Sequence, residues 1–360
     1  MMTERAVKYA RDNSIRETFR KVADQLGVDP MTVRRIFDDF SATFQTKGRF
    51  QTPEILGIDE LKIVGDYRCM LTNVQKLTVF DLLQTRKKAD LLSYFRGLPD
   101  RHRVKVITMD MWSVYRQVAQ AVFPGCPIVA DRFHVVRMAN DALERVRKRV
   151  RRELDLKARL KLKNERFILL KRARDLSEGD LAKLAAWSEQ FPALGAAHTA
   201  KEAFFDIYAH TDKQLAQASA RQWLHTVPSL VAKEFRETTV ALQSWWDEIF
   251  AWYDYPISNA YTESINRFAK DLNRMGRGYS FEVVRARLLL DSEARRPTTR
   301  RIRARVSANS DRMLYDSLSF MGMGRMGPAC LDQTEIVEKV VEYGPHIPTL
   351  CELLEADHFE

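Results

Sequence analysis

The chain has 360 residues, 45% of them hydrophobic, and a formal net charge of +10 at pH 7. This length fits two to three domains, and no apolar run approaches the roughly 18 uncharged residues that a membrane-spanning helix needs. The N-terminal residues contain no apolar segment of the kind that directs secretion, so we expect a cytoplasmic protein without a membrane partner. No two of the four cysteines form a C-x-x-C pair, which argues against a zinc ribbon.

The positive charge is concentrated in blocks, which favours a polyanionic partner such as DNA. One block spans residues 145–174 and another spans residues 295–305, whereas the segment after Leu331 is acidic. Solvated helix faces that carry charge pairs would produce similar blocks, so both interpretations stay open. The side chains of the first block that we expect to contact DNA are Arg147, Lys148, Arg151, Arg152 and Lys161.

Residues 14–40 have the apolar spacing of two short helices. Gly27 is a natural stop for the first helix, and Asp29 followed by Pro30 is typical of the start of the second. Two helices joined by a tight glycine turn form the helix-turn-helix pattern of DNA-binding proteins, although helical hairpins without a DNA role share it. The side chains that the second helix would expose to DNA are Thr32, Arg34 and Arg35.

After residue 51 the hydrophobic period changes to that of a mixed α/β unit. We expect a strand around Asp59, then two antiparallel strands that turn near residues 72–73, followed by a short helix. A strand that ends at Asp110, an amphipathic helix and a strand that ends at Asp131 complete the unit.

From Asp131 to Tyr253 the pattern is helical, without strand signals. Pro256 is then followed by Ser258 and Asn259, which are good helix-capping residues. They predict a helix that carries Glu263. A further helix follows residue 278, and the sequence after residue 300 is less regular.

Two aspartates lie at positions where a functional role is one of two possible explanations. Asp59 interrupts an apolar strand, where an ionised carboxylate is costly unless it is paired or binds a cation. Asp110 follows a strand, and α/β folds place their sites at the carboxyl ends of parallel strands. Each has a structural alternative, because Asp59 would also fit a solvent-facing strand edge and Asp110 would also fit a helix cap.

Glu263 lies one turn into its helix and shares one helical face with Asn259, Asn266 and Lys270. A polar stripe of this kind normally faces solvent. Two asparagines beside one glutamate are less usual on such a face, where lysine and glutamate dominate. The functional alternative is that Glu263 meets the aspartates, with Asn266 and Lys270 in contact with DNA.

Asp59, Asp110 and Glu263 together form a pattern that suits two divalent cations. Two aspartates on neighbouring strands and a glutamate on a following helix hold metal ions about 3.5–4 Å apart for phosphodiester chemistry. Hard cations such as Mg²⁺ prefer oxygen ligands, and we expect Mn²⁺ to substitute. We therefore predict that these three residues are both catalytic and metal-binding.

Three segments carry a resemblance to a known family: ILGIDE, VITMDMWSVYRQVAQAVFPGCPIVADRFHVVRMAND and YPISNAYTESINRFAKDLNRMGRGYSFEVVRARLLL. In this order they resemble the ISL-three family of bacterial insertion-sequence transposases, from the helix-turn-helix to about Leu290. The resemblance implies the DDE superfamily, an RNase H-like catalytic fold, and Asp59, Asp110 and Glu263 as the metal-binding triad. It also implies double-stranded DNA as the partner, both the terminal inverted repeats of the element and the target. The resemblance further implies a nucleoid-associated protein that acts as a homodimer or larger assembly.

The fold class that we expect is α/β plus all-α, an RNase H-like mixed sheet interrupted by a helical insertion. The expected boundaries are residues 1–50 for the helix-turn-helix, 51–135 and 256–300 for the two parts of the catalytic core, 136–255 for the insertion and 301–360 for a tail. The long insertion and the exposed-looking Trp245, Trp246 and Trp252 give indirect support for assembly, and the alternative for these tryptophans is an ordinary helical core.

Asp131 competes with Asp110 for the second position of the triad, because it also ends a strand and begins the motif-like DRFH. We favour Asp110 because it ends the strand that precedes the helix, the F-P pair and the next strand. Asp131 and His134 would then form a nearby second pair, with Asn259 close by. His134 would orient a ligand or a DNA phosphate, or be a packed, hydrogen-bonded core histidine.

The chain departs from the family in one respect. Members commonly begin with a cysteine-rich zinc-binding segment, and this sequence starts almost at the helix-turn-helix, as a shortened relative or a truncated copy would. Two other functions fit parts of the pattern. One is a non-catalytic helix-turn-helix DNA-binding regulator, and the other is a structure-specific nuclease that cuts without joining.

Overall fold

The computed structural model describes residues 2–47, 51–154 and 166–294, together with residues 156, 159, 160 and 162. Lys161, the basic segment 295–305 and the expected tail lie outside the described residues. The helices and strands are α1 (Glu4–Ser14), α2 (Phe19–Leu26), α3 (Pro30–Lys47), β1 (Ile55–Ile63), β2 (Asp66–Asn73), β3 (Thr78–Leu83), α4 (Lys88–Arg96), β4 (Val106–Met109), α5 (Ser113–Val122), β5 (Ile128–Ala130), α6 (Arg132–Arg152), α8 (Arg166–Leu170), α9 (Glu178–Gln190), α10 (Pro192–Asp206), α11 (Lys213–Thr226), α12 (Ala232–Ser244), α13 (Trp246–Asp254), α14 (Ala260–Gly276) and α15 (Phe281–Ala294).

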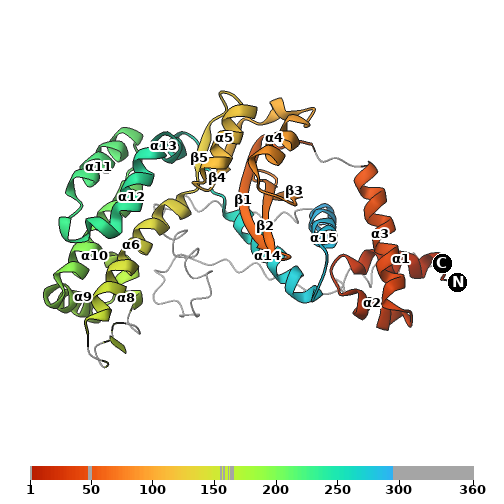
Figure 1. The fold of residues 1–360 in the computed structure, drawn as a ribbon, viewed down its shortest axis with the longest axis horizontal. Helices are drawn as coiled ribbons and strands as arrows, with labels where there is room; N and C mark the ends of the chain where they lie inside the picture. The colour runs from red at the N-terminus through yellow and green to blue at the C-terminus, as the bar shows by residue number, and fades with distance from the viewer. Residues whose placement is uncertain are drawn as a thin grey trace, which may run out of the picture. The chain divides into compact units, whose positions relative to one another are not determined.

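The strands form one mixed sheet in the order β3-β2-β1-β4-β5, as Figure 1 shows. β1, β2 and β3 pair antiparallel through short connections, whereas β1, β4 and β5 run parallel. Parallel neighbours need longer crossovers, which α4 and α5 provide. This is the α/β unit that the strand periods predict, and it is consistent with an RNase H-like DDE domain.

The two faces of the sheet are covered by different helices. Along β1 the side chains alternate between faces because of the pleat. Leu56 and Ile58 pack with residues of α4 and α5. Leu61 and Ile63 share a core with residues of α14 and α15. Asp59 has the same parity as Leu61, so its carboxylate is directed to the side of the sheet that α14 covers.

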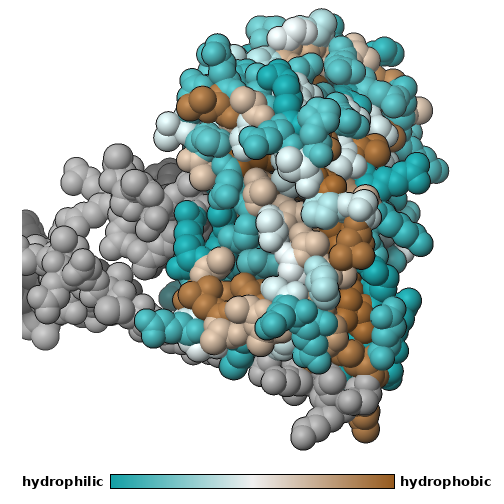
Figure 2. Space-filling view, turned by 90° about the vertical axis from the view of Figure 1, so that its left-hand side faces the viewer, coloured by the Kyte–Doolittle hydropathy of each residue, from teal (hydrophilic) through white to brown (hydrophobic). Residues whose placement is uncertain are grey.

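The helices from α6 to α13 build a core of their own, which includes Leu143, Phe204 and Phe250. Among the described residues this stretch contains no strand, as the sequence predicts. Trp245 is only 6% exposed, and Trp246 and Trp252 pack against the same core. Of the two alternatives for these tryptophans, the structure therefore supports the helical core. Figure 2 shows the face of the molecule on this side, which is mostly hydrophilic with separate hydrophobic patches.

Three helices precede the sheet, one more than expected. α1 carries a weak apolar signal, since only Ala10 and Ser14 of this helix are buried. α2 begins at Phe19, later than expected, because the hydroxyl of Thr18 accepts a hydrogen bond from the backbone N–H of Lys21 at 3.2 Å. Gly27 ends α2 with a φ of 66°, in agreement with its predicted role as a stop.

The turn between β2 and β3 lies after Asn73 and not at residues 72–73. Thr72 is fully buried within β2, where its hydroxyl lies 2.7 Å from that of Thr262 on α14. The side chain of Asn73 accepts a hydrogen bond from the backbone N–H of Lys76 at 2.9 Å and so closes the turn. The sequence placed the turn one residue too early because Thr72 and Asn73 are both polar. The hydroxyl of Thr72 contacts α14 and is not part of the loop.

Candidate metal centre and active site

Three aspartates lie in one row across the parallel part of the sheet. Ile58 of β1 pairs with Met109 of β4, and Met109 pairs with Ala130 of β5. The residues that follow these partners are Asp59, Asp110 and Asp131. Because side chains alternate along a strand, the three carboxylates leave the sheet on the same side, opposite to the core of α4 and α5.

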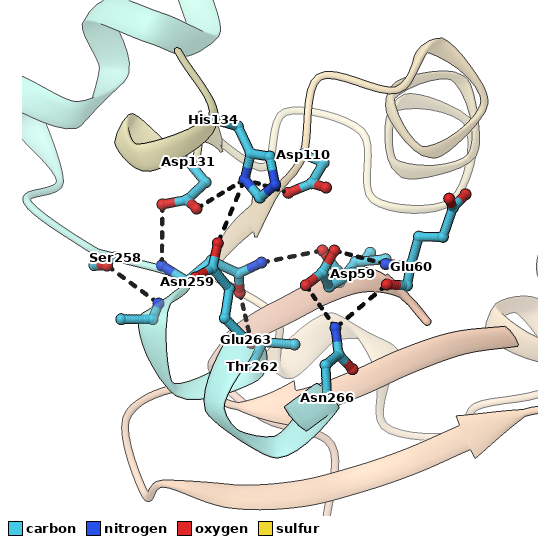
Figure 3. Close-up of polar contacts among 12 residues, drawn as sticks. Asp59, Glu60, Asp110, Asp131, His134, Ser258, Asn259, Thr262, Glu263 and Asn266 are labelled. Carbon is cyan, nitrogen blue, oxygen red and sulfur yellow. Dashed lines mark hydrogen bonds and ion pairs between the residues drawn. The ribbon is translucent and has the colours of Figure 1, made fainter. Parts of the chain in front are cut away.

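Glu263 approaches this row from α14, which packs on β1 and β2. It lies in the first turn of the helix, whose N-cap is Asn259. The hydroxyl of Ser258 accepts a hydrogen bond from the N–H of Ala260 at 3.1 Å and satisfies a backbone donor of the first turn. Figure 3 shows Glu263 directed toward His134 and the aspartates.

Gly57 of β1 allows this close approach. A Cβ atom built on Gly57 would lie 2.7 Å from the hydroxyl of Thr262 and 2.9 Å from the side-chain oxygen of Asn259. Any larger residue would therefore force α14 away from the strand. Glycine at this position sets the distance between Glu263 and Asp59.

Asn259 is completely buried and fixes the start of α14. Its amide donates to the carbonyl of Ile58 at 3.3 Å, and its side-chain oxygen accepts from the hydroxyl of Thr262 at 2.6 Å. Its backbone N–H donates to Asp131 at 3.4 Å. One asparagine thus ties the glutamate-bearing helix to both β1 and the end of β5.

Asn266, which we expected to contact DNA, lies buried beside Asp59. It is 7% exposed, and its amide donates to Asp59 Oδ2 at 2.7 Å. The other carboxylate oxygen of Asp59 accepts from the backbone N–H of Glu60 at 2.6 Å. The stripe that includes Asn259 and Asn266 therefore faces the sheet and not solvent, whereas Lys270 at its far end is exposed.

His134 stands among three carboxylates, as Figure 3 shows. Its Nδ1 lies 2.9 Å from Asp110 Oδ1, 3.1 Å from Asp131 Oδ2 and 3.7 Å from Glu263 Oε1. Burial disfavours the charged imidazole, but the hydrogen bonds with Asp110 and Asp131 outweigh it and raise the pKa of His134 to about 11. The ring therefore supplies positive charge to this cluster.

The carboxylates themselves resist ionisation together. Burial, reinforced by the charge of Asp110, raises the pKa of Asp59 well above its usual range. Burial and the charge of Asp131 raise the pKa of Glu263 to about 7. Like charges held in a partly desolvated site disfavour each other's ionised form. A cation bound here would remove that repulsion.

The donor atoms suit a hard divalent cation. Ligand atoms from Asp110, Asp131 and His134 lie within 4.8 Å of one another, and Asp59 and Glu263 border the same space. Carboxylate oxygens are what Mg²⁺ and Mn²⁺ prefer. Burial, followed by the neighbouring carboxylates, raises the pKa values of Asp59 and Glu263, so a bound cation would stabilise their ionised forms, and the residues present fit the metal ions that the sequence predicts.

Comparison with known proteins agrees with this geometry. A family model for ISL-three (ISL3) DDE transposases, described as a transposase, matches residues 56–288, which include every residue of the cluster. The chain belongs to this family. It is also 23% identical, over 233 residues, to the transposase for insertion sequence element IS1001 of Bordetella parapertussis. That alignment covers 63% of this chain and 57% of the relative, so the chain spans little more than half of the relative's length.

The basic residues that we predicted to contact DNA are of two kinds. Arg147 is 3% exposed, donates to Glu144 at 2.9 Å and to the carbonyl of Leu162 at 3.0 Å. Arg147 thus forms an internal ion pair, and this burial argues against its predicted contact with DNA. Lys148 and Arg152, beside it on α6, are exposed, and Arg151 is half-buried.

The predicted DNA-contacting residues of α3 lie at or near the surface. Arg35 is exposed, while Thr32 and Arg34 are half-buried. Arg34 pairs with Asp38 at 2.8 Å, one helical turn further on. Their contact with DNA stays a prediction, and Lys161 lies outside the described residues.

Several residues that shape the candidate site carried no signal in the sequence. Gly57, Thr72 and Thr262 form the contact between β1, β2 and α14. The hydroxyl of Tyr115 on α5 donates to the backbone carbonyl of Asp59 at 3.4 Å from the opposite face. A glycine inside an otherwise apolar strand was the one available hint, because such glycines often mark close backbone approach.

No helix among the described residues is long and apolar enough to cross a membrane.

Proposed function

We propose that this chain cleaves the ends of an insertion sequence by metal-dependent hydrolysis and joins the freed 3′-hydroxyls to target DNA. The observation that carries the proposal is the convergence of Asp59, Asp110 and Glu263 on one side of the sheet. The membership of the chain in the transposase family supports the reaction class. The raised pKa values of Asp59 and Glu263 support a cation-binding role. A regulator that only binds DNA would have no use for this cluster.

We assign the metal ligands to Asp59, Asp110 and Glu263. Two bound Mg²⁺ ions, or Mn²⁺ in their place, would lower the pKa of the attacking hydroxyl group and neutralise charge on the leaving oxygen. Asp59 is oriented by Asn266, and Glu263 is oriented by the docking of α14. These contacts hold the donor atoms in place before DNA arrives.

The choice of Asp110 over Asp131 is supported by exposure. The side chain of Asp110 is 22% exposed and that of Glu263 is 27% exposed, whereas Asp131 is 1% exposed. Asp131 also contacts His134 and the backbone of Asn259. We therefore assign Asp131 and His134 as positioning residues that orient Asp110 and the start of α14.

The proposed chemistry has two balanced steps. Water attacks the phosphodiester at the element end, the P–O3′ bond breaks, and the products are a 3′-hydroxyl and a 5′-phosphate. The 3′-hydroxyl then attacks a target phosphodiester, so a new P–O3′ bond forms as one target bond breaks. Neither step needs a covalent enzyme intermediate or a nucleotide cofactor.

The proposed partners are double-stranded DNA and a second copy of the chain. We propose that α2 and α3 act as a helix-turn-helix on the terminal inverted repeats, with Thr32, Arg34 and Arg35 facing the DNA. Lys148, Arg151 and Arg152 on α6, together with Lys270, would follow the phosphate backbone. Work on bacterial chromosomal DNA would place the protein with the nucleoid in the cytoplasm.

The test is strand cleavage and strand transfer on a labelled element-end oligonucleotide with Mg²⁺ or Mn²⁺. We expect Asp59→Asn, Asp110→Asn and Glu263→Gln each to reduce both reactions by about 10³-fold, because each removes a ligand of the reacting centre. Glu189→Gln, which removes an exposed carboxylate on α9, is the matched control and should leave both reactions unchanged.

Three results would contradict parts of the proposal. Full activity in any of the three carboxylate variants would exclude that residue as a metal ligand. Metal-dependent cleavage without any joined product would indicate a nuclease. DNA binding without cleavage under any metal condition would favour the regulator.

A further inference from the structure

A pocket of about 450 Å³ opens beside the carboxylates. Asp110 and His134 line one part of it, and the rest is formed mainly by Met111, Trp112, Met138 and Trp245. We call it the tryptophan pocket. The centre that we propose for phosphodiester chemistry and this pocket therefore share two residues. A ligand in the pocket would therefore lie next to Asp110 and His134.

The two tryptophans come from distant parts of the chain. Trp112 lies between β4 and α5 in the sheet domain, and Trp245 lies between α12 and α13 in the helical insertion. The insertion thus contributes a wall to a pocket whose other wall belongs to the sheet domain. Neither part would form the pocket alone.

Both rings are held in place by arginines. The guanidinium carbon of Arg86 lies 4.8 Å from the ring centroid of Trp112, and Arg86 also pairs with Glu60. The guanidinium carbon of Arg116 lies 4.0 Å from the ring centroid of Trp245. Cations over aromatic faces stabilise such arrangements. The rings are therefore pre-positioned, which lowers the entropic cost of binding a flat ligand.

The chemistry of the lining suits a flat, partly apolar and partly polar ligand. Trp112, which is half-buried, offers a ring for stacking, and Trp245, Met111 and Met138 offer dispersion contacts. Glu60, Arg137 and Asp141 add hydrogen-bonding groups at the same pocket. A volume of about 450 Å³ lies within the range of small-molecule sites. A nucleobase has this combination of flat faces and polar edges.

We propose that the tryptophan pocket binds one unpaired nucleobase of the DNA strand whose phosphate lies at the carboxylates. This rests on the proposed function, because that function places DNA here. A base inside a duplex has both faces covered by its neighbours, so it must leave the stack to enter. Stacking on aromatic side chains tolerates any base, and it would hold the scissile strand in register with Asp110.

The experiment compares two DNA duplexes that carry the fluorescent base 2-aminopurine, one as a single-nucleotide bulge and one fully paired. Affinity is measured by anisotropy, and base stacking is measured by 2-aminopurine fluorescence, with Ca²⁺ present. We expect the wild type to bind the bulged duplex about tenfold more tightly than the paired one, since stacking of a single base supplies an effect of this order. Its fluorescence should change on binding.

Trp112→Ala should abolish the preference for the bulge, while Trp112→Phe should keep most of it. Met138→Trp, which fills the pocket without removing a wall, should abolish it too. Trp246→Ala is the matched control, because Trp246 neighbours Trp245 but does not line the pocket. Melting temperatures of all variants distinguish loss of the pocket from loss of the fold. If Trp112→Ala melts early, the comparison rests on Trp112→Phe and Met138→Trp.

Equal affinity of the wild type for both duplexes would overturn the proposal, as would a bulge preference that survives Met138→Trp. The proposed function fails separately. Metal-dependent cleavage that requires Asp59 but shows no bulge preference removes only the nucleobase site. A bulge preference lost in Met138→Trp, without cleavage under any metal condition, keeps the pocket and removes the transposase chemistry.

Discussion

A carboxylate in the middle of a buried strand must be stabilised by its immediate neighbours. Asp59 is 5% exposed, and its two oxygens accept hydrogen bonds from the amide of Asn266 and the backbone N–H of Glu60. Such contacts compensate for part of the lost hydration, but the raised pKa of Asp59 indicates that they do not compensate for all of it. The ionised form of Asp59 is therefore unfavourable in this site, and a bound cation would stabilise it.

Removing the amide that faces Asp59 should weaken metal binding. We expect Asn266→Ala to lower the affinity for Mn²⁺ by about 10- to 100-fold, because residues that orient a ligand usually contribute this much. Isothermal titration calorimetry measures the affinity directly. Asn140→Ala is the control, since Asn140 is a similarly buried asparagine on α6. An unchanged affinity in Asn266→Ala would mean that Asp59 needs no orienting partner.

The smallest side chain at the site sets its geometry. We expect Gly57→Ala to reduce strand cleavage strongly and to lower the free energy of unfolding by about 1–3 kcal/mol, because the added methyl group collides with Thr262 and Asn259. Cleavage assays and denaturant unfolding measure the two effects. Gly179→Ala on α9 is the matched control, because nothing lies within 4 Å of its added methyl group. A fully active Gly57→Ala protein would show that α14 can shift without consequence.

At the scale of single elements, α10 holds the short helix α8 through a buried lysine. Lys201 is 0% exposed, and its ammonium group donates to the carbonyls of Leu169 at 3.0 Å and Lys171 at 2.6 Å. It also pairs with Glu202 at 2.7 Å. The lysine therefore satisfies carbonyl groups at the end of α8 that the helix itself leaves without partners.

His198, one turn before Lys201 on α10, makes this region sensitive to acid. Burial, together with the charge of Lys201, lowers the pKa of His198 to about 4 from an ordinary value of 6.5. Between these pH values the unfolded chain binds more protons than the folded chain, so stability rises with pH in this window. As the pH falls from 6.5 to 4, we expect a loss of about 3 kcal/mol from this group.

Urea unfolding monitored at several pH values between 4 and 7 tests this expectation. His198→Gln removes the titrating group and keeps a polar side chain of similar size, so it should flatten the pH dependence in this window. His225→Gln, at the C-terminal end of α11, serves as the control and should leave the slope unchanged. An equal slope in the wild type and His198→Gln would assign the acid sensitivity to other groups.

The elements themselves were largely predictable, because strand and helix periods are local properties. The strands around Asp59, Asp110 and Asp131 and the helix of Glu263 are where the sequence predicts them. The orientation of α14 was not predictable from its own residues. A stripe with Asn259 and Asn266 resembles a solvent-facing surface, and only the partner strand, with glycine at residue 57, makes it an inward-facing one.

The ranking of the aspartates also needed the sheet register. In the sequence, Asp110 and Asp131 both follow apolar strands, and only the order of the strands favours Asp110. The register places them side by side, and their different exposure then separates them. In the same way, Arg147 and Lys148 are equally basic in the sequence, and only the packing of α6 makes one an internal ion pair and the other a surface charge.

Across the whole molecule, the N-terminal helices share a core with the helices that carry the site. Arg287 of α15 is fully buried, and its guanidinium carbon lies 4.4 Å from the ring centroid of Tyr279 and 4.8 Å from that of Phe19 on α2. It also donates to the backbone carbonyl of Glu17 at 2.8 Å. The proposed DNA-recognition helices are therefore packed directly against the helices of the proposed catalytic core.

Surface charge on α6 should then contribute to DNA binding in a way that buried charge does not. We expect Lys148→Ala and Arg152→Ala each to reduce the slope of log K against log salt by about 0.9, the effect of losing one phosphate contact, with an unchanged melting temperature. Arg147→Ala should affect stability and not the salt dependence of DNA binding. It leaves Glu144 without its partner inside the protein, so it should cost about 3 kcal/mol of stability and leave the salt slope of the folded protein unchanged.

Fluorescence anisotropy with a labelled duplex at 50–300 mM salt (roughly the useful range for such slopes) and thermal melting give the two readouts. The comparison is internal, because residues 147 and 148 are adjacent and carry the same charge. Arg35→Ala on α3 adds a reference from the proposed helix-turn-helix. If Lys148→Ala and Arg152→Ala leave the slope unchanged while Arg35→Ala lowers it, the DNA path does not include α6. The insertion would then serve the site through its wall of the tryptophan pocket alone.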